Sequence, residues 1–346
     1  MKQYKAAIVG ATGYAGEELV RLLINHPDVE IGAISSVSFE GKPISSVYPS
    51  LLGFCDMVCV SQNEAVESAD VVFAALPHGL SEPLAKLCLE KGKKFVDLGA
   101  DFRLEREEDY KEWYNKSYDC PEIHGEAVYC IPELSREKAK NKNIIANPGC
   151  YPTSAALGLT PALENGLVFI DPIIVDSKSG ATGAGRGLSQ TTHYPDCNEA
   201  FSPYKVGIHR HTPEIEQSLS HAAGESVKIT FVPHLLPVNR GIVSTIYSRL
   251  KPGVTFEDVR KVYEEKYNNE QFVRVLPSGS VANLKNVKYT NMCDISLHID
   301  VRTNTLIVVS TIDNMVKGAA GQAIQNMNII LGLDEAAGLK LVPPAF

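Results

Sequence analysis

One cysteine stands where a covalent nucleophile would be expected. The apolar run at residues 144–146 is followed by the segment NPGCYPT, which carries Asn147, Gly149, Cys150 and Pro152. Proline suits the first turn of a helix, so we predict that Pro152 opens one and that Cys150 lies at its N-terminus. The partial positive charge there lowers the pKa of a thiol. Cys150 is therefore a candidate nucleophile. The alternative is a buried structural cysteine, which is our interpretation of the other seven.

Two histidines in KVGIHRHTPEIEQ offer a proton acceptor for such a thiol. Thr212 is the expected N-cap and Pro213 the expected first residue of a helix, so His209 and His211 should precede that helix. We prefer His211, beside the cap, as the general acid/base, with Glu214 orienting or charge-tuning its imidazole. The alternatives are surface histidines without a role, or a zinc site. Zinc needs a third protein ligand that no nearby pattern offers, so no metal is predicted.

A glycine-rich turn near the start of the chain is typical of dinucleotide binding. The segment GATGYAGEEL follows an apolar run and precedes an amphipathic stretch. In that setting, backbone amides at a helix N-terminus can hold a pyrophosphate. The pattern is GxxGxxG and not the commoner GxGxxG, and the alternative is a turn without a ligand. The predicted cofactor-binding residues are Gly10, Thr12, Gly13, Tyr14, Ala15 and Gly16.

The residues after the second apolar run bear on which nicotinamide cofactor is used. NAD enzymes usually place an Asp or Glu about 20 residues after the glycines to bind the ribose hydroxyls. This chain has Ser35 and Ser36, and then Lys42. Hydroxyls tolerate a 2′-phosphate and a lysine neutralises it, whereas a carboxylate would repel it. We therefore predict NADPH, with both serines as binding residues. The alternative is that they only end a strand.

A second glycine-rich loop and an arginine extend the set of candidate binding residues. The loop SKSGATGAGRGLS carries Gly180 and Gly183, whose amides could close over the nicotinamide or a substrate phosphate. A mobile loop or a subunit contact is the alternative. Arg103, in DLGADFRL, could hold an anionic substrate group or only pair with Asp101. The predicted substrate-binding residues are Arg103, Asn147, His209 and Glu214.

These residues need a scaffold, and the first 147 residues predict an α/β one. Short apolar runs alternate with helical stretches, which indicates a parallel sheet covered by helices on both faces. Ligands in such sheets bind beyond the carboxyl ends of the strands. The expected strands are residues 5–10, 29–34, 70–76, 95–98 and 144–146, and the expected helices follow the glycine turn and cover residues 81–91.

Beyond Asn147 the pattern changes to longer strand-like stretches. They predict a mixed or antiparallel sheet with helices on one face. We expect the exposed face of that sheet to need a second copy of the chain, in a homo-oligomer. The last helix is expected to return to the first domain. The predicted strands are residues 227–232, 241–250, 295–301 and 305–311, and the predicted helices are residues 256–267 and 318–331.

Composition limits the compartment and the partners. The chain has 346 residues, of which 44% are hydrophobic and 21% are charged, as expected for about two globular domains. A net charge of −8 without a basic stretch argues against nucleic acid. No apolar run approaches the ~18 residues of a membrane helix, and the N-terminus lacks the features of a signal peptide. Eight scattered cysteines predict reduced thiols in the cytoplasm.

With these motifs assembled, the chain resembles the N-acetyl-gamma-glutamyl-phosphate reductase family of arginine biosynthesis. The resemblance implies a Rossmann-type NADP-binding domain at residues 1–147 and 313–346. It also implies an α+β catalytic and oligomerisation domain of the semialdehyde-dehydrogenase type at residues 148–312. Cys150 would be the nucleophile, the histidine segment would supply the acid/base, and Asn314 would lie near the nicotinamide. The motifs, in chain order, are GATGYAGEEL, LPHGLS, DLGADFRL, YCIPEL, NPGCYPT, SKSGATGAGR, HRHTPEIEQ, PHLLPVNRGI and STIDNMVKGAAGQA.

The resemblance implies NADPH-dependent reduction of N-acetyl-gamma-glutamyl phosphate through a Cys150 thioester, in a homodimer or homotetramer. Three alternative functions remain open. A sister reductase would act on aspartyl phosphate or on carrier-bound aminoadipyl phosphate, although this acidic sequence shows no basic stretch for an acidic carrier. A cysteine hydrolase or acyltransferase would use Cys150 and His211 as a dyad but leaves the glycine turn unexplained. An NADPH sensor would be insensitive to loss of the thiol.

Overall fold

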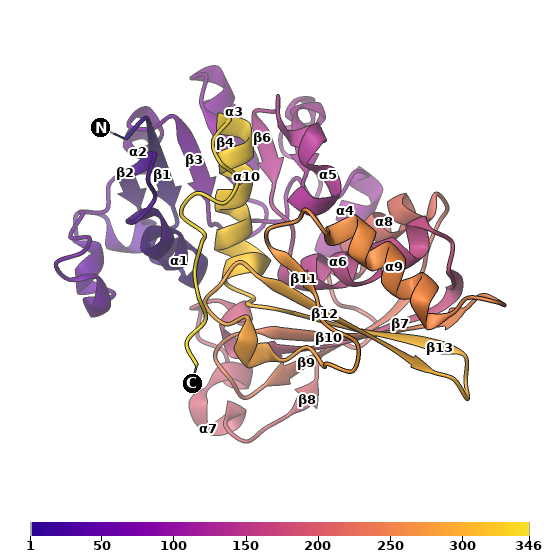
Figure 1. Cartoon of the computed structure of the whole chain (residues 1–346). Coiled ribbons are helices and arrows are strands. Elements are labelled where there is room, and N and C mark those ends of the chain that lie inside the picture. The colour runs from indigo at the N-terminus through magenta and orange to yellow at the C-terminus, as the bar shows by residue number, and fades with distance from the viewer. Residues whose placement is uncertain (1, 346) are drawn as a thin grey trace. The chain divides into compact units, whose positions relative to one another are not determined.

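The structure is a computed structural model that describes residues 2–345, and it divides into two compact units. Unit 1 takes Met1–Pro148 and Ala319–Lys340, and unit 2 takes Gly149–Gly318 and Leu341–Phe346. Each unit is built on one sheet (Figure 1). The sheet of unit 1 is parallel and that of unit 2 is mixed, which confirms the predicted fold class.

The sheet of unit 1 has the strand order β2-β1-β3-β4-β6-β5, and every neighbouring pair is parallel. The loops that follow β1, β3 and β4 therefore meet at one edge. The strands are β1 (Tyr4–Val9), β2 (Val29–Ser35), β3 (Val71–Ala74), β4 (Lys94–Asp97), β5 (Ala127–Tyr129) and β6 (Ile144–Ala146). The helices are α1 (Tyr14–Leu23), α2 (Gln62–Glu67), α3 (Ser81–Glu90), α4 (Glu107–Tyr114), α5 (Pro132–Ala139) and α10 (Gly321–Leu331).

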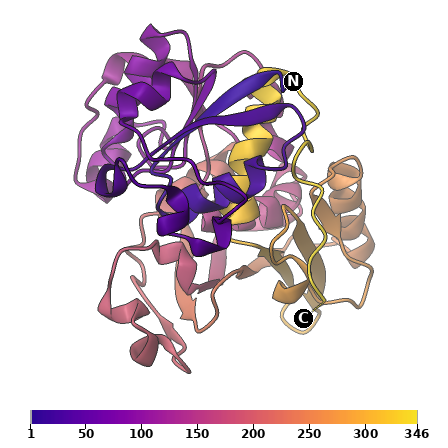
Figure 2. The ribbon, with the colours of Figure 1, turned by 90° about the vertical axis from the view of Figure 1, so that its left-hand side faces the viewer.

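Helices cover both faces of this sheet, which explains its continuous apolar strands. Ala7 and Val9 of β1 face a core with α2 and α3, whereas α1 and α10 pack together on the other face, where Ile8 is fully buried. Figure 2 shows α10, drawn in yellow, beside the strands of unit 1. The return of the last helix to these strands makes unit 1 discontinuous in sequence.

Unit 2 has a mixed sheet with the order β11-β12-β13-β10-β7-β9-β8. Its long central strands are antiparallel, whereas β7 pairs with β9, and β11 with β12, in parallel. The strands are β7 (Val168–Gly180), β8 (Ser202–Pro203), β9 (Ile229–Leu236), β10 (Ile242–Leu250), β11 (Val273–Val275), β12 (Cys293–Asp300) and β13 (Thr305–Ile312). The helices are α6 (Cys150–Glu164), α7 (Tyr194–Cys197), α8 (Thr212–Ala223) and α9 (Phe256–Tyr267).

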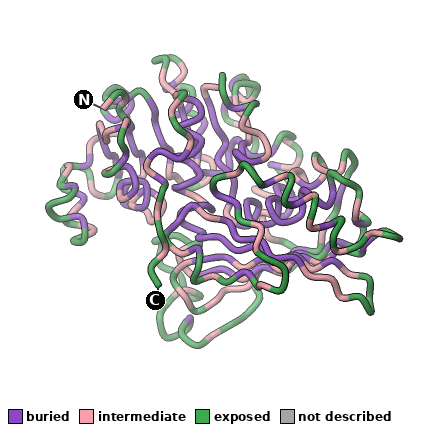
Figure 3. Tube along the Cα trace, in the orientation of Figure 1, coloured by how far each residue is buried: buried purple, intermediate pink, exposed green. Residues whose placement is uncertain are grey.

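The central strands of unit 2 alternate between a buried and a more open face. Along β10, Ile242, Ser244 and Ile246 are buried against α6, and the residues between them are only partly buried. Figure 3 shows the strands mainly as buried, with exposed residues concentrated in loops. The hydroxyls of Tyr263 and Tyr267 on α9 donate to carbonyls of α6 at 2.7 and 2.6 Å. These contacts tie α6, which carries the candidate nucleophile, to α9.

Several elements differ from the prediction. The sequence analysis missed α2, α4, α5 and β5, which are short or strongly polar. The strand expected at residues 227–232 is β9, which begins at Ile229, and the last helix starts as a π-helical turn at Val316–Ala320. Among the described residues, no helix is both long and apolar enough to cross a membrane. All eight cysteines are unbridged thiols.

Candidate active site

In unit 1 the glycine turn has the shape that a pyrophosphate requires. Gly10 has a φ of +85°, and a Cβ there would lie 2.4 Å from the carbonyl oxygen of Ala75. A Cβ on Gly16 would lie 2.3 Å from the carbonyl oxygen of Gly10. A Cβ on Gly13, the N-cap of α1, would meet only that carbonyl, at 3.4 Å. The turn is therefore open at Gly13, where the first amides of α1, from Tyr14 onward, fit a pyrophosphate.

The structure joins this turn to the end of β2, as the predicted cofactor site requires. The carbonyl of Ser35 accepts the amide of Gly10 at 2.9 Å, and the hydroxyls of Thr12 and Ser36 lie 2.7 Å apart. The hydroxyl of Tyr48 donates to the carbonyl of Thr12 at 3.0 Å. Tyr48 was missed by the sequence analysis, because it reaches the turn from an irregular segment 36 residues away.

Arg103 and Asn147, two predicted substrate-binding residues, contact each other in unit 1. The Nε of Arg103 donates to the carbonyl of Asn147 at 2.9 Å, and a second guanidinium nitrogen donates to the carbonyl of Leu98 at 2.8 Å. The amide nitrogen of Asn147 donates to the carbonyl of Ala319 at 3.1 Å, and its Oδ1 accepts from Asn326 at 3.1 Å. These contacts fix the backbone where β6 ends, and a role in substrate binding stays a prediction.

In unit 2, Asn314 ties the second glycine-rich loop to the turn before β10. Its Oδ1 accepts the amide of Gly241 at 2.6 Å, and its amide nitrogen donates to the Thr182 hydroxyl at 3.0 Å. A Cβ on Gly183 would approach the same amide nitrogen at 3.5 Å, and the amide of Gly180 donates to the carbonyl of Gly241 at 2.9 Å. The structure therefore brings together the predicted residues Gly180, Gly183 and Asn314.

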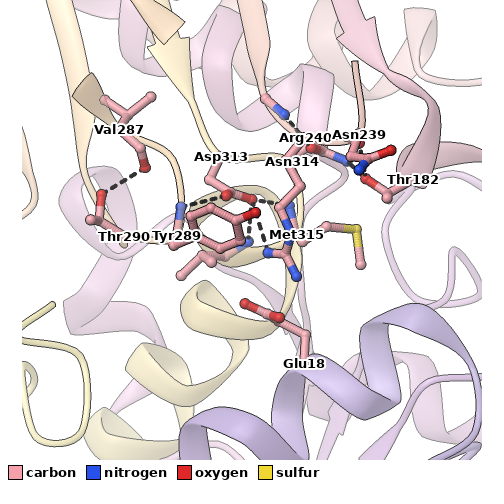
Figure 4. Close-up of polar contacts among 12 residues, drawn as sticks. Glu18, Thr182, Asn239, Arg240, Val287, Tyr289, Thr290, Asp313, Asn314 and Met315 are labelled. Atoms are coloured by element: carbon pink, nitrogen blue, oxygen red, sulfur yellow. Dashed lines mark hydrogen bonds and ion pairs between the residues drawn. The ribbon is translucent and has the colours of Figure 1, made fainter. Parts of the chain in front are cut away.

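Asp313, the residue before Asn314, fixes the backbone next to the turn before β10. Asp313 is fully buried, and its carboxylate accepts the amides of Tyr289 and Met315, each at 2.7 Å (Figure 4). The guanidinium of Arg240 lies 3.6 Å from the same carboxylate and 4.9 Å from the Tyr289 ring. Neither Asp313 nor Arg240 was a predicted site residue, because only the fold brings these segments together.

Cys150 is the first residue of α6, so the thiol lies at the N-terminus of a 15-residue helix, as expected. It is half-buried, whereas the other seven cysteines are buried. The prediction that Pro152 opens the helix is wrong by two residues. The first helical hydrogen bond runs from the amide of Thr153 to the carbonyl of Gly149 at 3.0 Å. Proline is tolerated throughout the first turn, because those amides have no helical acceptor.

Glu214 connects the turn before this thiol to α8. It is 1% exposed, and its Oε1 accepts the amide of Gly149 at 2.7 Å. A carboxylate held at a helix N-terminus is also stabilised by the helix dipole. Glu214 therefore fixes the backbone from which Cys150 projects, a contact that the sequence analysis did not foresee.

The two histidines have different environments beside Tyr151. The rings of His209 and His211 lie 5.6 and 6.0 Å from the Tyr151 ring and 4.9 Å from each other. His209 is packed edge-on against Tyr204 and Phe231, and its Nδ1 accepts the amide of His211 at 3.0 Å. Burial, reinforced by nearby cationic side chains, lowers the pKa of His209 to about 4. His209 is therefore neutral at physiological pH, and its Nδ1 helps to fix the backbone of His211.

The predicted helix start at Pro213, with Thr212 as N-cap, is wrong by one residue. The helix α8 begins at Thr212, and His211 occupies the N-cap position. The backbone of His211 is already in the helical region, and its carbonyl accepts the amide of Ile215 at 3.0 Å. His211 therefore belongs to the first turn of α8 and shares the rigidity of that helix.

Comparison with known proteins agrees with this geometry. Residues 5–142 match the NAD binding domain of semialdehyde dehydrogenase, and residues 150–314 match its dimerisation domain. The N-acetyl-gamma-glutamyl-phosphate reductase of Clostridium beijerinckii is 58% identical over 342 residues, which cover 99% of both chains. The enzyme of the same name from Brachyspira hyodysenteriae is 58% identical over 350 residues, again covering 99% of both chains. The chain belongs to the N-acetyl-gamma-glutamyl-phosphate reductase family.

Solved structures of more distant proteins share the fold of this family member. Aspartate semialdehyde dehydrogenase II from Vibrio cholerae, complexed with ASA, has a TM-score of 0.73 at 16% identity, covering 96% of this chain and 99% of that one. Aspartate semialdehyde dehydrogenase with NADP from Candida albicans has a TM-score of 0.66 at 19% identity, covering 95% and 99%. At these identities the likeness concerns the fold alone.

A glycine that faces Cys150 gives a first testable prediction for this family member. A Cβ on Gly318 would lie 2.7 Å from the Cβ and 3.2 Å from the Cα of Cys150. Gly318→Ala should therefore displace the start of α6 and lower kcat by about 10- to 100-fold, since small misplacements of reacting groups are costly. The rate of thiol alkylation by iodoacetamide should change in parallel.

The matched control is Gly125→Ala, because a Cβ there meets no atom within 4 Å and the φ of Gly125 lies outside the positive range. This control should leave both rates unchanged. A Gly318→Ala variant with wild-type kcat and alkylation would show that the close approach to Cys150 has no functional role.

Proposed function

We propose that this chain catalyses the NADPH-dependent reduction of N-acetyl-gamma-glutamyl phosphate to N-acetyl-L-glutamate 5-semialdehyde and phosphate, in arginine biosynthesis. The observation that carries the proposal is Cys150, a half-buried thiol at the start of α6 in a chain whose close relatives bear the name of this reductase. Unit 1 supplies the cofactor turn, with Ser35, Ser36 and Lys42 suited to the 2′-phosphate of NADPH.

The proposed chemistry begins at Cys150. Its thiolate attacks the acyl carbon of the phosphorylated carboxylate, a C–S bond forms, and the C–O bond to phosphate breaks. Amides in the first turn of α6 are available to hold the developing oxyanion. NADPH, when bound on the glycine turn, supplies the hydride for the resulting thioester. The reduced thiohemiacetal then loses the Cys150 thiolate and leaves the aldehyde.

The other predicted residues serve this thiol and its substrate. His211 accepts the thiol proton, gives it to the oxyanion that forms on hydride transfer, and takes it back as the hydroxyl becomes the aldehyde carbonyl. His211 then returns the proton to the departing Cys150 thiolate, so the chain stores no net proton after each turnover. Glu214 positions Cys150 through the amide of Gly149. Arg103, with its fixed charge, is suited to an anionic end of the substrate, whereas His209 acts through the backbone of His211.

We also propose that the chain forms a homodimer or homotetramer through unit 2. Residues 150–314 match a dimerisation domain, and the open face of the mixed sheet carries apolar residues such as Ile174, which is 38% exposed. A partner would cover this face. Sedimentation analysis distinguishes the two assemblies, and a monomer at assay concentration would contradict the proposal. The cytoplasm stays the predicted compartment.

The deciding experiment is the reverse reaction with N-acetylglutamate semialdehyde, phosphate and NADP. Formation of NADPH only when phosphate is present supports the proposed reductase. Turnover with aspartate semialdehyde instead would move the chain to the sister reaction. Tight NADP binding without turnover of either semialdehyde would overturn the reductase proposal and favour a sensor.

A further inference from the structure

Unit 1 contains a pair of buried carboxylates that the proposed reaction does not use. Asp97 ends β4 and Asp101 lies four residues later, and both are fully buried. Charged groups are rarely buried side by side without a function or a compensating partner. Ser81 links the two side chains, because its amide donates to Asp101 and its hydroxyl donates to Asp97. Both lie at the carboxyl edge of the parallel sheet, where the loops after β1, β3 and β4 come together.

Asp101 has the surroundings of an ionised carboxylate. Its Oδ1 accepts the amide of Gly79 and, at 3.0 Å, the hydroxyl of Tyr110. Its Oδ2 accepts the amide of Ser81 at 2.8 Å. Both oxygens therefore act only as acceptors, and two of the three donors are backbone amides, one in the loop between β3 and α3 and one at the first residue of α3. Asp101 fixes the conformation of this loop directly.

Asp97 has the surroundings of a neutral acid. Its Oδ1 accepts the Ser81 hydroxyl at 2.7 Å and the Gly99 amide at 2.8 Å, whereas its Oδ2 is buried without a hydrogen-bond partner among the described residues. An ionised oxygen without a partner is costly to bury, so a proton on Oδ2 is favoured. Burial, and then the charge of Asp101, raise the pKa of Asp97 to about 7.

The titratable groups around Asp97 are few. Asp101 opposes its ionisation and Arg103, on the same loop, favours it, and Tyr110 of α4 faces Asp97 only through Asp101. On α3 the neighbour of Ser81 is Glu82, whose carboxylate lies 3.4 Å from the His124 ring nitrogen. The packed elements β3, β6 and α10 carry no titratable side chain between their ends. Asp97, with a pKa of about 7, therefore changes charge near neutral pH.

The loop held by this pair touches the glycine turn. The carbonyl of Ala75, at the start of the loop, lies where a Cβ on Gly10 would be 2.4 Å away. The amide of Ala75 also donates to the carbonyl of Val9, the last residue of β1, at 2.8 Å. The start of the β3–α3 loop therefore packs directly against the turn that fits the pyrophosphate.

We propose that Asp97 and Asp101 are positioning residues that hold the β3–α3 loop against the glycine turn, and that NADPH binds tightly only while Asp97 is neutral. This inference rests on the proposed use of NADPH. When Asp97 ionises, its charge opposes that of Asp101, loosens the grip on the amides of Gly79 and Ser81, and weakens cofactor binding. The affinity for NADPH therefore falls as pH rises through the Asp97 transition.

The test is a fluorescence titration of the full-length protein with NADPH from pH 6 to pH 9 in phosphate-free buffer. The dissociation constant of the wild type should rise about tenfold across this range relative to that of Asp97→Asn, because asparagine mimics the neutral acid. A tenfold change corresponds to a shift of about one unit in the pKa of Asp97 when NADPH binds. Titration of the 2′-phosphate near pH ~6 affects both proteins equally and cancels in the ratio.

A second variant shows whether Asp97 itself is the titrating group. Ser81→Ala removes a hydrogen bond that favours the ionised form, so the midpoint of the NADPH transition should move to higher pH. Asp70→Asn is the matched control, because this carboxylate lies at the opposite edge of the sheet and accepts the Lys5 amide at 2.9 Å. It should keep the wild-type curve. Thermal melting of each variant confirms folding.

The outcomes separate the two proposals. A constant ratio between wild type and Asp97→Asn at all pH values, or an unmoved midpoint in Ser81→Ala, would overturn the role of the pair while leaving the reductase proposal intact. A wild-type protein that fails to bind NADPH at every pH overturns the proposed function, and the inference with it.

Discussion

Replacing Cys150 by serine is expected to lower kcat for phosphate-dependent NADP reduction by on the order of 10³-fold or more. A serine hydroxyl at the start of α6 stays protonated near neutral pH, so it is a poor nucleophile, and an ester is a weaker hydride acceptor than a thioester. The affinity for NADPH should not change, because the proposed cofactor turn belongs to unit 1. The measurement is the reverse assay together with an NADPH titration.

Cys197→Ser is the control for this substitution. Cys197 is a buried cysteine of the same unit, on the short helix α7, and its replacement should leave kcat within about twofold of the wild type, as for most substitutions outside a site. If Cys150→Ser kept more than about a tenth of the wild-type kcat, the covalent mechanism would be wrong.

Replacing His211 by asparagine is expected to lower kcat by about 10²- to 10⁴-fold, the usual contribution of a general acid/base. The loss should come with a change in the pH profile, because the acid limb of kcat disappears when the group that must be deprotonated is removed. Stopped-flow measurement of kcat between pH 5 and pH 9 provides both quantities. The KM for the semialdehyde should change much less.

His209→Asn provides the contrast that the structure makes possible. Burial keeps the pKa of His209 near 4, so its ring is neutral over the whole assay range and cannot create the acid limb. The variant should keep that limb and lose less than about tenfold in kcat, since an asparagine oxygen can still accept the His211 amide. An acid limb lost in His209→Asn and kept in His211→Asn would reverse the assignment.

The elements that the sequence predicted well are those with a strong local pattern. Residues 144–146 are predicted and observed as β6, because a short apolar run buried on both faces leaves few alternatives. The helix α9 was predicted at its observed bounds, since Thr255 and Asp258 form a capping box at its start. By contrast, β5 spans three residues and exists only through its pairing with β6.

The candidate site likewise contains features that a local sequence pattern predicts and features that depend on long-range contacts. The position of Cys150 at a helix start is encoded within a few residues, by Gly149 before it and Pro152 after it. The bond from Gly149 to Glu214 joins residues 65 positions apart, and the carboxylate pair depends on loops after two different strands. No local pattern predicts such contacts, because they arise only when the chain closes on itself.

The discontinuity of unit 1 has a consequence for synthesis on the ribosome. The helix α10 is buried from Gly321 to Ile330 and packs against α5 and β4, yet it is translated after Gly149–Gly318, the main segment of unit 2. The strands of unit 1 are synthesised first, but one apolar face of their sheet therefore stays uncovered until α10 has been synthesised. The main segment of unit 2, Gly149–Gly318, is fully synthesised before α10, so unit 1 begins first but gains its last helix only after that segment. A chain released at Gly318 would keep that apolar face exposed and would be prone to aggregation and proteolysis.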